Sequence, residues 1–175
     1  MNHDARKHFL ARMLGQKDMP SGSAEPSHQT AVLVVDDSRT VNIALQRILE
    51  SAGYLTVAAF DGAQAVDMAE RYRPDLILMD IVMPRMNGFE ATRAIRAKPD
   101  TRYTPIIIVS GNDQPSDRIW GTRIGAKGFL SKPINKAELL KTIETTLLIA
   151  QRDQALRERG VAAGAPVIPL LDKDF

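Results

Sequence analysis

The sequence predicts an α/β fold in which five parallel strands form one sheet with helices on both of its faces. Five short apolar runs alternate with longer segments whose apolar residues recur at helical spacing. The runs are mostly continuous rather than alternating, which is typical of parallel strands buried on both sides. The predicted strands span residues 31–35, 55–59, 76–79, 106–109 and 128–130.

Helix start and stop signals fill the first two gaps between these strands. Ser38 can cap a first helix, which Gly53 stops. Asp61 followed by Gln64 resembles a capping box at the start of a second helix, and Pro74 ends that helix. Both connections are therefore helical.

The remaining gaps carry the same kind of signal. A third helix is marked by Phe89, Thr92 and Ile95 and ends before Pro99. A fourth helical segment spans 113–124. Asn135 and Glu138 form another capping pair, which opens the last helix. One stripe of this last helix consists of Leu139, Leu140, Ile143 and Leu147.

The chain of 175 residues divides into one domain and two appendages. Residues 1–29 form an N-terminal extension, in which 4–14 can make a short amphipathic helix and 15–29 read as a Gly-, Pro- and Ser-rich linker. The domain spans 30–150, and 151–175 form a helix extension and a tail. The helix at 4–14 could dock on a partner or a membrane surface, but a helix this short is marginal in water.

Composition excludes several classes of function. A net charge of +2 gives no strong field for nucleic acid. There is no cysteine, and the three histidines all lie within the first 28 residues, so thiol and histidine chemistry are not expected. The apolar runs are far shorter than the roughly 18 residues of a membrane span. We therefore expect a cytoplasmic protein without stable membrane insertion, and the roughly 25 residues after the domain are too few for a helix-turn-helix effector.

Charged and hydroxyl side chains follow four of the predicted strands. Asp36 and Asp37 follow the first strand, Asp80 the third, Ser110 the fourth and Lys132 the fifth. If the strand order is 2-1-3-4-5, the first and third strands are neighbours at the point where the order reverses. Ligands bind there, outside the carboxyl ends of the strands. The pattern therefore predicts one site made of three acids, a hydroxyl and an ammonium.

Three carboxylates in one site need a counter-charge. Lys132 supplies one positive charge, and Mg²⁺, with Mn²⁺ as an alternative ion, can supply the rest because it prefers oxygen ligands. A carboxylate beside such a cation can act as the nucleophile in phosphoryl transfer and become an aspartyl-phosphate.

Four motifs carry a family resemblance: VVDDS, DLILMDIVMPRMNG, IIIVSG and GFLSKP. Over about residues 30–150 the chain resembles the response-regulator receiver domain of two-component signalling, of the CheY-like, single-domain chemotaxis type. The resemblance implies a flavodoxin-like doubly wound fold with strand order 2-1-3-4-5.

The resemblance also implies roles for the acids. Asp80 would be the phosphoacceptor of this phosphoprotein. Asp36, Asp37 and Asp80 would hold the metal together with the backbone carbonyl of Val82.

The remaining roles concern the switch that follows phosphorylation. Ser110 would be the switch hydroxyl, Phe129 the switch aromatic and Lys132 the phosphate-contacting lysine, with a cis bond before Pro133. Phe129 replaces the more frequent Tyr. Gly111 stands where Ala or another small residue is usual, which keeps access to the acids open.

The partners that the resemblance implies are a histidine kinase and a downstream protein. The downstream protein would bind a face made by 113–124, 128–130 and the last helix, in a chemotaxis or pilus-motility system. The chain would be a monomer or a phosphorylation-dependent dimer, would bind no nucleic acid, and would catalyse only its own phosphorylation and dephosphorylation.

Plainer interpretations stay open at this stage. Asp36 and Asp37 could merely complement a helix dipole, Ser110 could be an ordinary strand-end hydroxyl, and Phe129 could be core. The whole chain could be a phosphorylation-independent scaffold or, less in keeping with the motifs, an aspartyl-nucleophile phosphatase. A phosphatase of that kind favours an Asp-x-Asp pair at the first strand, whereas Asp36 and Asp37 are adjacent.

Overall fold

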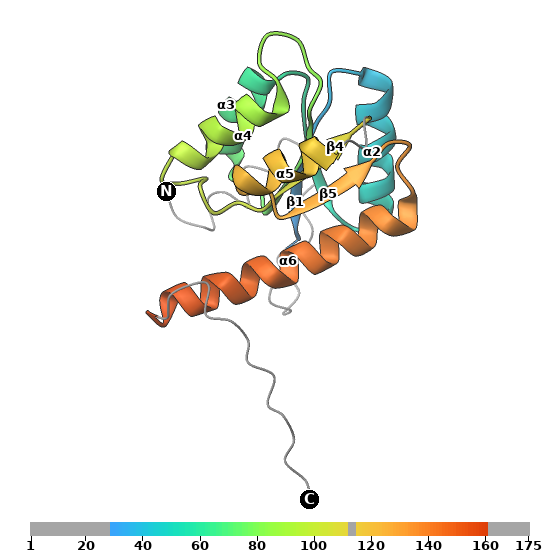
Figure 1. Ribbon diagram of the computed structural model, residues 1–175. Coiled ribbons are helices and arrows are strands. Elements are labelled where there is room, and N and C mark those ends of the chain that lie inside the picture. The colour runs from blue at the N-terminus through green and yellow to red at the C-terminus, as the bar shows by residue number, and fades with distance from the viewer. Residues whose placement is uncertain (1–28, 112–114, 161–175) are drawn as a thin grey trace, which may run out of the picture.

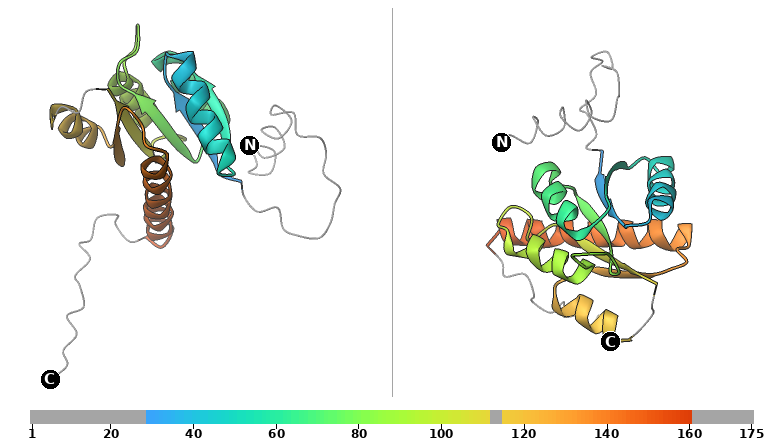
Figure 2. Two further views of the ribbon diagram at one scale, coloured as in Figure 1. Left: turned by 90° about the vertical axis from the view of Figure 1, so that its right-hand side faces the viewer. Right: turned by 90° about the horizontal axis from the view of Figure 1, so that it is seen from above.

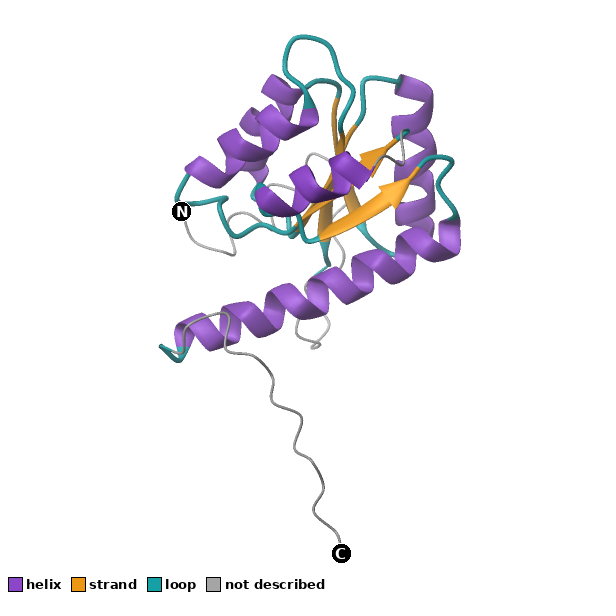
Figure 3. Cartoon of the chain, in the orientation of Figure 1, coloured by secondary structure: helices purple, strands orange, loops and turns teal. Residues whose placement is uncertain are grey.

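The computed structural model describes residues 29–111 and 115–160, which form one α/β unit (Figure 1). Figure 3 shows the strands gathered at the centre and the helices around them. The strands are β1 (Ala31–Val35), β2 (Leu55–Ala59), β3 (Leu76–Asp80), β4 (Ile106–Ser110) and β5 (Gly128–Ser131). The helices are α2 (Arg39–Ser51), α3 (Gly62–Tyr72), α4 (Gly88–Ala97), α5 (Pro115–Arg123) and α6 (Lys136–Glu158).

All five strands are parallel, and their order is β2-β1-β3-β4-β5, which confirms the predicted fold class. β1 lies between β2 and β3, so the strand order reverses there. The register aligns the strand ends: Val35 lies opposite Met79, and Ser110 lies opposite Ser131. Residues that follow these strands therefore emerge at one edge of the sheet, the carboxyl edge.

Each face of the sheet has its own apolar core, because neighbouring strand residues point to opposite faces. On one face α3 and α4 cover the strands, and Phe129 packs against that cluster. On the other face α2 and α6 cover them through Leu45, Leu49, Leu139 and Ile143. Figure 2 shows this arrangement from two further directions. The two cores hold the strand ends at the carboxyl edge in fixed positions.

Side-chain caps begin most of the helices, as expected. Ser38 caps α2, Asp61 caps α3 and Asn135 caps α6. The predicted capping box of α3 differs in one bond, because the Gln64 side chain accepts from the backbone of Phe60 rather than from that of Asp61. The complete capping box belongs to α4, where the Asn87 and Glu90 side chains bond each other's backbone N–H.

The last helix, α6, continues unbroken past residue 150 to Glu158. Two contacts fix its far end to the domain: Lys127 pairs with Asp153 at 3.3 Å, and the Arg157 guanidinium lies 4.3 Å from the centre of the Tyr103 ring. The helix predicted at 4–14, most of the linker and the tail lie outside the described residues. Within the described ranges, no helix combines the length and apolar character needed to cross a membrane.

Candidate functional site

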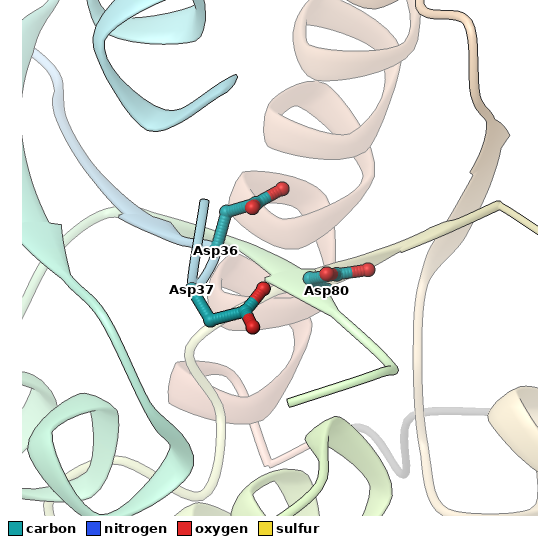
Figure 4. A group of neighbouring side chains, drawn as sticks. All are labelled: Asp36, Asp37 and Asp80. Atoms are coloured by element: carbon teal, nitrogen blue, oxygen red, sulfur yellow. The ribbon is translucent and has the colours of Figure 1, made fainter. Parts of the chain in front are cut away.

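Three carboxylates meet at the carboxyl edge of the sheet. Asp36 and Asp37 lie on the segment that leaves β1, and Asp80 ends β3, with all three facing one space (Figure 4). One oxygen from each carboxylate lies within 4.8 Å of the others. Asp36 and Asp80 are buried, whereas Asp37 is exposed. The sequence reasoning thus brought together residues that are neighbours in the fold, and the exposed Asp37 leaves the cluster open to solvent.

The Lys132 ammonium completes this cluster from the end of β5. Its Nζ lies 2.8 Å from Asp36 Oδ2 and 3.1 Å from Asp80 Oδ2. The other oxygens of these two carboxylates accept backbone bonds: Asp36 Oδ1 from the N–H of Ser38, and Asp80 Oδ1 from the N–H of Ile81, each at 2.9 Å. Every carboxylate oxygen of Asp36 and Asp80 therefore has a donor that fixes its direction.

The electrostatics of the cluster favour a further cation. Burial raises the pKa of Asp80 above its ordinary value, the Lys132 ammonium acts against this rise, and the Asp36 charge adds to it. Burial acts to lower the pKa of Lys132, but its hydrogen bonds to Asp36 and Asp80 outweigh burial and raise that pKa. One ammonium facing three carboxylates leaves an excess of negative charge. A hard divalent ion such as Mg²⁺, which takes a few carboxylates and keeps several waters, fits this donor set.

The other predicted site residues lie around the cluster. Ser110 is buried at the end of β4, and its backbone carbonyl accepts from the Lys132 N–H at 2.7 Å. Phe129 is partly buried on β5, against the core on the α3 and α4 face. Val82 is exposed in the loop after β3, and the Lys132–Pro133 bond is cis. The sequence thus predicted side chains from four strand ends that share one edge.

Asn42 is a residue of this region that the sequence reasoning missed. Its side chain is fully buried on α2, and its amide nitrogen donates toward the carbonyls of Ala59, Val34 and Asp36 at 3.0 to 3.4 Å. It therefore ties the ends of β1 and β2 together beneath Asp36. The signal that could have revealed it is an amide on the apolar stripe of the first helix.

Two glycines beside the site were also missed. A Cβ on Gly88 would lie 2.0 Å from the backbone oxygen of Asp80, so the start of α4 touches the end of β3 without room for a side chain. A Cβ on Gly62 would lie 2.5 Å from the backbone oxygen of Met86. The Gly62 contact lets the loop 81–87 lie against the start of α3, and the Gly88 contact closes the same loop at its base. Both depend on how this loop folds, which a single sequence does not show.

A doubly wound sheet with an acid cluster and a lysine at the reversal of strand order defines a receiver of the two-component type, and comparison with known families agrees. The family model of the response regulator receiver domain matches residues 32–144. The chain therefore belongs to the response regulator receiver family.

Individual relatives differ in how much of their length this chain covers. The chain is 44% identical over 116 residues to the protein PilH of Pseudomonas aeruginosa, an alignment that covers 66% of this chain and 96% of PilH. Other response regulators that it matches are longer, and it spans 31% to 54% of their length. PilH is thus a relative whose whole length is about that of one receiver domain.

Solved structures show the same fold. The chemotaxis protein CheY4 of Vibrio cholerae superposes with a TM-score of 0.65 at 36% identity, covering 67% of this chain and 98% of CheY4. The receiver domain of the sensor histidine kinase PA1611 from Pseudomonas aeruginosa superposes with a TM-score of 0.64, also at 36% identity, covering 68% of this chain and 98% of that domain. That second structure has a magnesium ion coordinated in its active-site cleft.

Proposed function

We propose that this chain is a stand-alone response regulator that accepts a phosphoryl group on Asp80 from the phosphohistidine of a histidine kinase. The observation that carries this proposal is the convergence of Asp36, Asp37, Asp80 and Lys132 at one edge of a receiver fold. A scaffold that did not use phosphate would gain nothing from an under-compensated, buried carboxylate at this position.

In the proposed reaction an Asp80 carboxylate oxygen attacks phosphorus, and the bond from phosphorus to the histidine nitrogen breaks as the imidazole leaves. Asp36, Asp37, Asp80 and the Val82 carbonyl would hold Mg²⁺, or Mn²⁺ in its place. When bound, the ion supplies positive charge to the phosphoryl oxygens. Lys132 supplies a second positive charge from within the chain, 3.1 Å from Asp80. Positioning and electrostatics suffice for this chemistry, and the chain would catalyse only its own phosphorylation and dephosphorylation.

The conformational response would start at Ser110. We assign to its hydroxyl a contact with the new phosphoryl oxygens, after which Phe129 would move toward the space that the hydroxyl leaves. Gly121 on α5 faces the Phe129 ring, since a Cβ there would lie 3.6 Å from it. Movement of Phe129 would therefore change its contact with α5. The face made by α5, β5 and α6 would then change its affinity for a protein partner.

The proposed setting is a cytoplasmic chemotaxis or pilus-motility pathway, in which the chain acts as a monomer or a phosphorylation-dependent dimer. Two comparisons favour this setting: the likeness that covers nearly the whole length of PilH, and the superposition on the chemotaxis protein CheY4.

One fluorescence experiment tests the reaction and the switch together. Trp120 is the single tryptophan of the chain, and it lies 56% exposed on α5, in the face that would change. Acetyl phosphate with Mg²⁺ should alter its emission in the wild type but not in Asp80→Asn. Equal emission before and after treatment in both proteins, with full phosphorylation of the wild type, would contradict the proposed switch.

A further inference from the structure

A groove lies at the edge of the sheet opposite the carboxylate cluster. Its volume is about 610 Å³. Its floor is the beginning of three strands, represented by Thr30, Asp75 and Pro105, and one wall is the second half of α6 from Leu147 to Glu158. We call it the basal groove. Figure 1 shows α6 as the long orange to red helix running beneath the lower ends of the strands and beyond the sheet.

The lining of the basal groove combines apolar surface with acids. Tyr103, Leu147 and Ala150 contribute apolar surface, and Tyr103 is 56% exposed even though Arg157 packs on its ring. The lining acids are Asp75, Asp100 and Glu158, against the single lining base Arg157. Two bases outside the lining offset part of this charge: Arg73 pairs with Asp100, and the Arg102 guanidinium lies 4.9 Å from the centre of the Tyr103 ring. The groove therefore suits a partly apolar segment with a basic face.

We propose that residues 4–14 of this same chain dock as an amphipathic helix in the basal groove. Their sequence, DARKHFLARML, places Ala5, Phe9 and Met13 on one helical stripe. The same segment carries three permanent bases and one acid, a charge balance opposite to that of the groove lining. An isolated helix of this length is marginal in water, so it needs a surface on which to bury its stripe.

The lengths agree with this docking. An eleven-residue helix is about 16 Å long, which is also about the distance along α6 from Leu147 to Glu158. The chain enters the described structure at Gln29, and the next residue, Thr30, lines the groove itself. A Gly-, Pro- and Ser-rich linker of fifteen residues, as the sequence predicts for 15–29, would span roughly 20 Å on average. Tethering at this range gives an effective concentration in the millimolar range, so even a weak intrinsic affinity keeps the groove filled.

The other end of the chain is a poorer occupant. Residues 161–175 carry Asp172 and Asp174 against the single base Lys173, so an acidic groove repels them. They also hold Pro166 and Pro169, which do not fit a helix interior. A second copy of this chain would bring the same segment, but without the gain in effective concentration. The geometry therefore points to docking within one chain, which also assigns the N-terminal extension a place other than a membrane surface.

Disulfide trapping tests this proposal in the full-length chain, which has no native cysteine. Ala5→Cys or Leu14→Cys, one at each end of the segment, is combined with Gln154→Cys on the groove wall. The matched control replaces Gln154→Cys by Thr145→Cys, which is exposed on the opposite side of α6. Each pair is also made with Phe9→Asp, which places a charge on the apolar stripe. Folding of every variant is checked by circular dichroism.

We expect at least one pair with Gln154→Cys to form its intramolecular disulfide about tenfold or more faster than the matched pair with Thr145→Cys. Phe9→Asp should reduce that rate to the rate of the control and leave the control unchanged. Equal rates for the two positions at both ends of the segment would overturn the proposal. So would a fast rate that Phe9→Asp does not alter, or a disulfide that forms only between chains.

Discussion

Lys132 Nζ donates to Asp36 Oδ2 at 2.8 Å across a separation of 96 residues in the sequence. The contact joins the end of β5 to the end of β1, which are not neighbours in the sheet. Because the same ammonium also lies 3.1 Å from Asp80, one side chain holds two of the three acids in place. The chain's own side chains therefore hold the candidate site together.

The raised pKa of Asp80 predicts that Asp80→Asn stabilises the metal-free protein at neutral pH. Burial raises this pKa, so the folded state holds the proton more tightly than the unfolded state does. Ionised Asp80 therefore costs stability, and the cost appears as pH rises above the ordinary pKa of 3.8. Urea unfolding in EDTA should show a higher free energy of unfolding for Asp80→Asn at pH 7 and a smaller difference near pH 4. A less stable variant at pH 7 would contradict this account of the carboxyl.

The acid cluster predicts that Mg²⁺ stabilises the protein through Asp37. Asp37 is exposed, so Asp37→Asn should leave the stability in EDTA within about 0.5 kcal/mol of the wild type. Mg²⁺ at ten times its dissociation constant should add about 1.4 kcal/mol to the wild type and much less to Asp37→Asn. Asp67→Asn removes an exposed acid on α3 and serves as the control. Thermal shift with increasing Mg²⁺ measures both effects, and an equal shift for Asp37→Asn and the control would exclude Asp37 as a ligand.

The contact at Gly88 predicts a strong effect of a single methyl group. In Gly88→Ala the new Cβ would lie 2.0 Å from the Asp80 backbone oxygen and 3.0 Å from Ile81 Cα, so β3 and α4 must separate. We expect a loss of about 3 kcal/mol in the free energy of unfolding, at the upper end of the overpacking range. Gly111→Ala is the matched control beside the same site, since its Cβ would meet nothing within 4 Å. Its stability should be unchanged or higher by up to about 1 kcal/mol. Similar losses in both variants would show that the Gly88 contact is not the cause.

The half-buried guanidinium of Arg96 predicts a second large effect on stability, at the other end of the domain. It donates to the carbonyls of Arg102, Thr104 and Gly125, and so joins α4 to the turn that precedes β5. Arg96→Met should cost about 3 kcal/mol, because hydrogen bonds to a charged group are lost and carbonyls are left without a donor. Arg93→Met, an exposed arginine of the same helix, should change stability by less than about 0.5 kcal/mol. Equal losses on urea unfolding would refute this role.

Local signals were enough to predict most of the fold. The caps at Ser38, Asp61 and Asn135 act within three residues of sequence, so a single chain displays them. The strand order 2-1-3-4-5 came from the resemblance to receiver domains. Given that order, the acids after the first and third strands were expected to be neighbours, and Asp36, Asp37 and Asp80 do lie together.

The features that escaped prediction depend on tertiary contacts rather than on local sequence signals. In the sequence, Asn42 and Arg96 are ordinary helix residues. Their roles become visible only in the fold, where their side chains donate to backbone carbonyls of other segments. Gly88 is, in the sequence, a glycine at the start of a helix. Only the fold shows that the end of β3 lies against it and leaves no room for a side chain. The contacts that hold the last turns of α6 were also missed, because Lys127 and Tyr103 fix these turns rather than a continuous apolar stripe. In each case the decisive partner belongs to another segment of the fold, and no local sequence signal identifies it.

The most direct test of the central claim is the intact mass of the protein after incubation with Mg²⁺ and acetyl phosphate. The wild type should gain about 80 Da, the mass of one phosphoryl group on a carboxylate. The gain should disappear in EDTA and in Asp80→Asn, and it should persist in the control Asp67→Asn. A gain of the same size in Asp80→Asn would contradict the assignment of Asp80. No gain in the folded wild type, with a cognate kinase as well as with acetyl phosphate, would contradict phosphorylation itself.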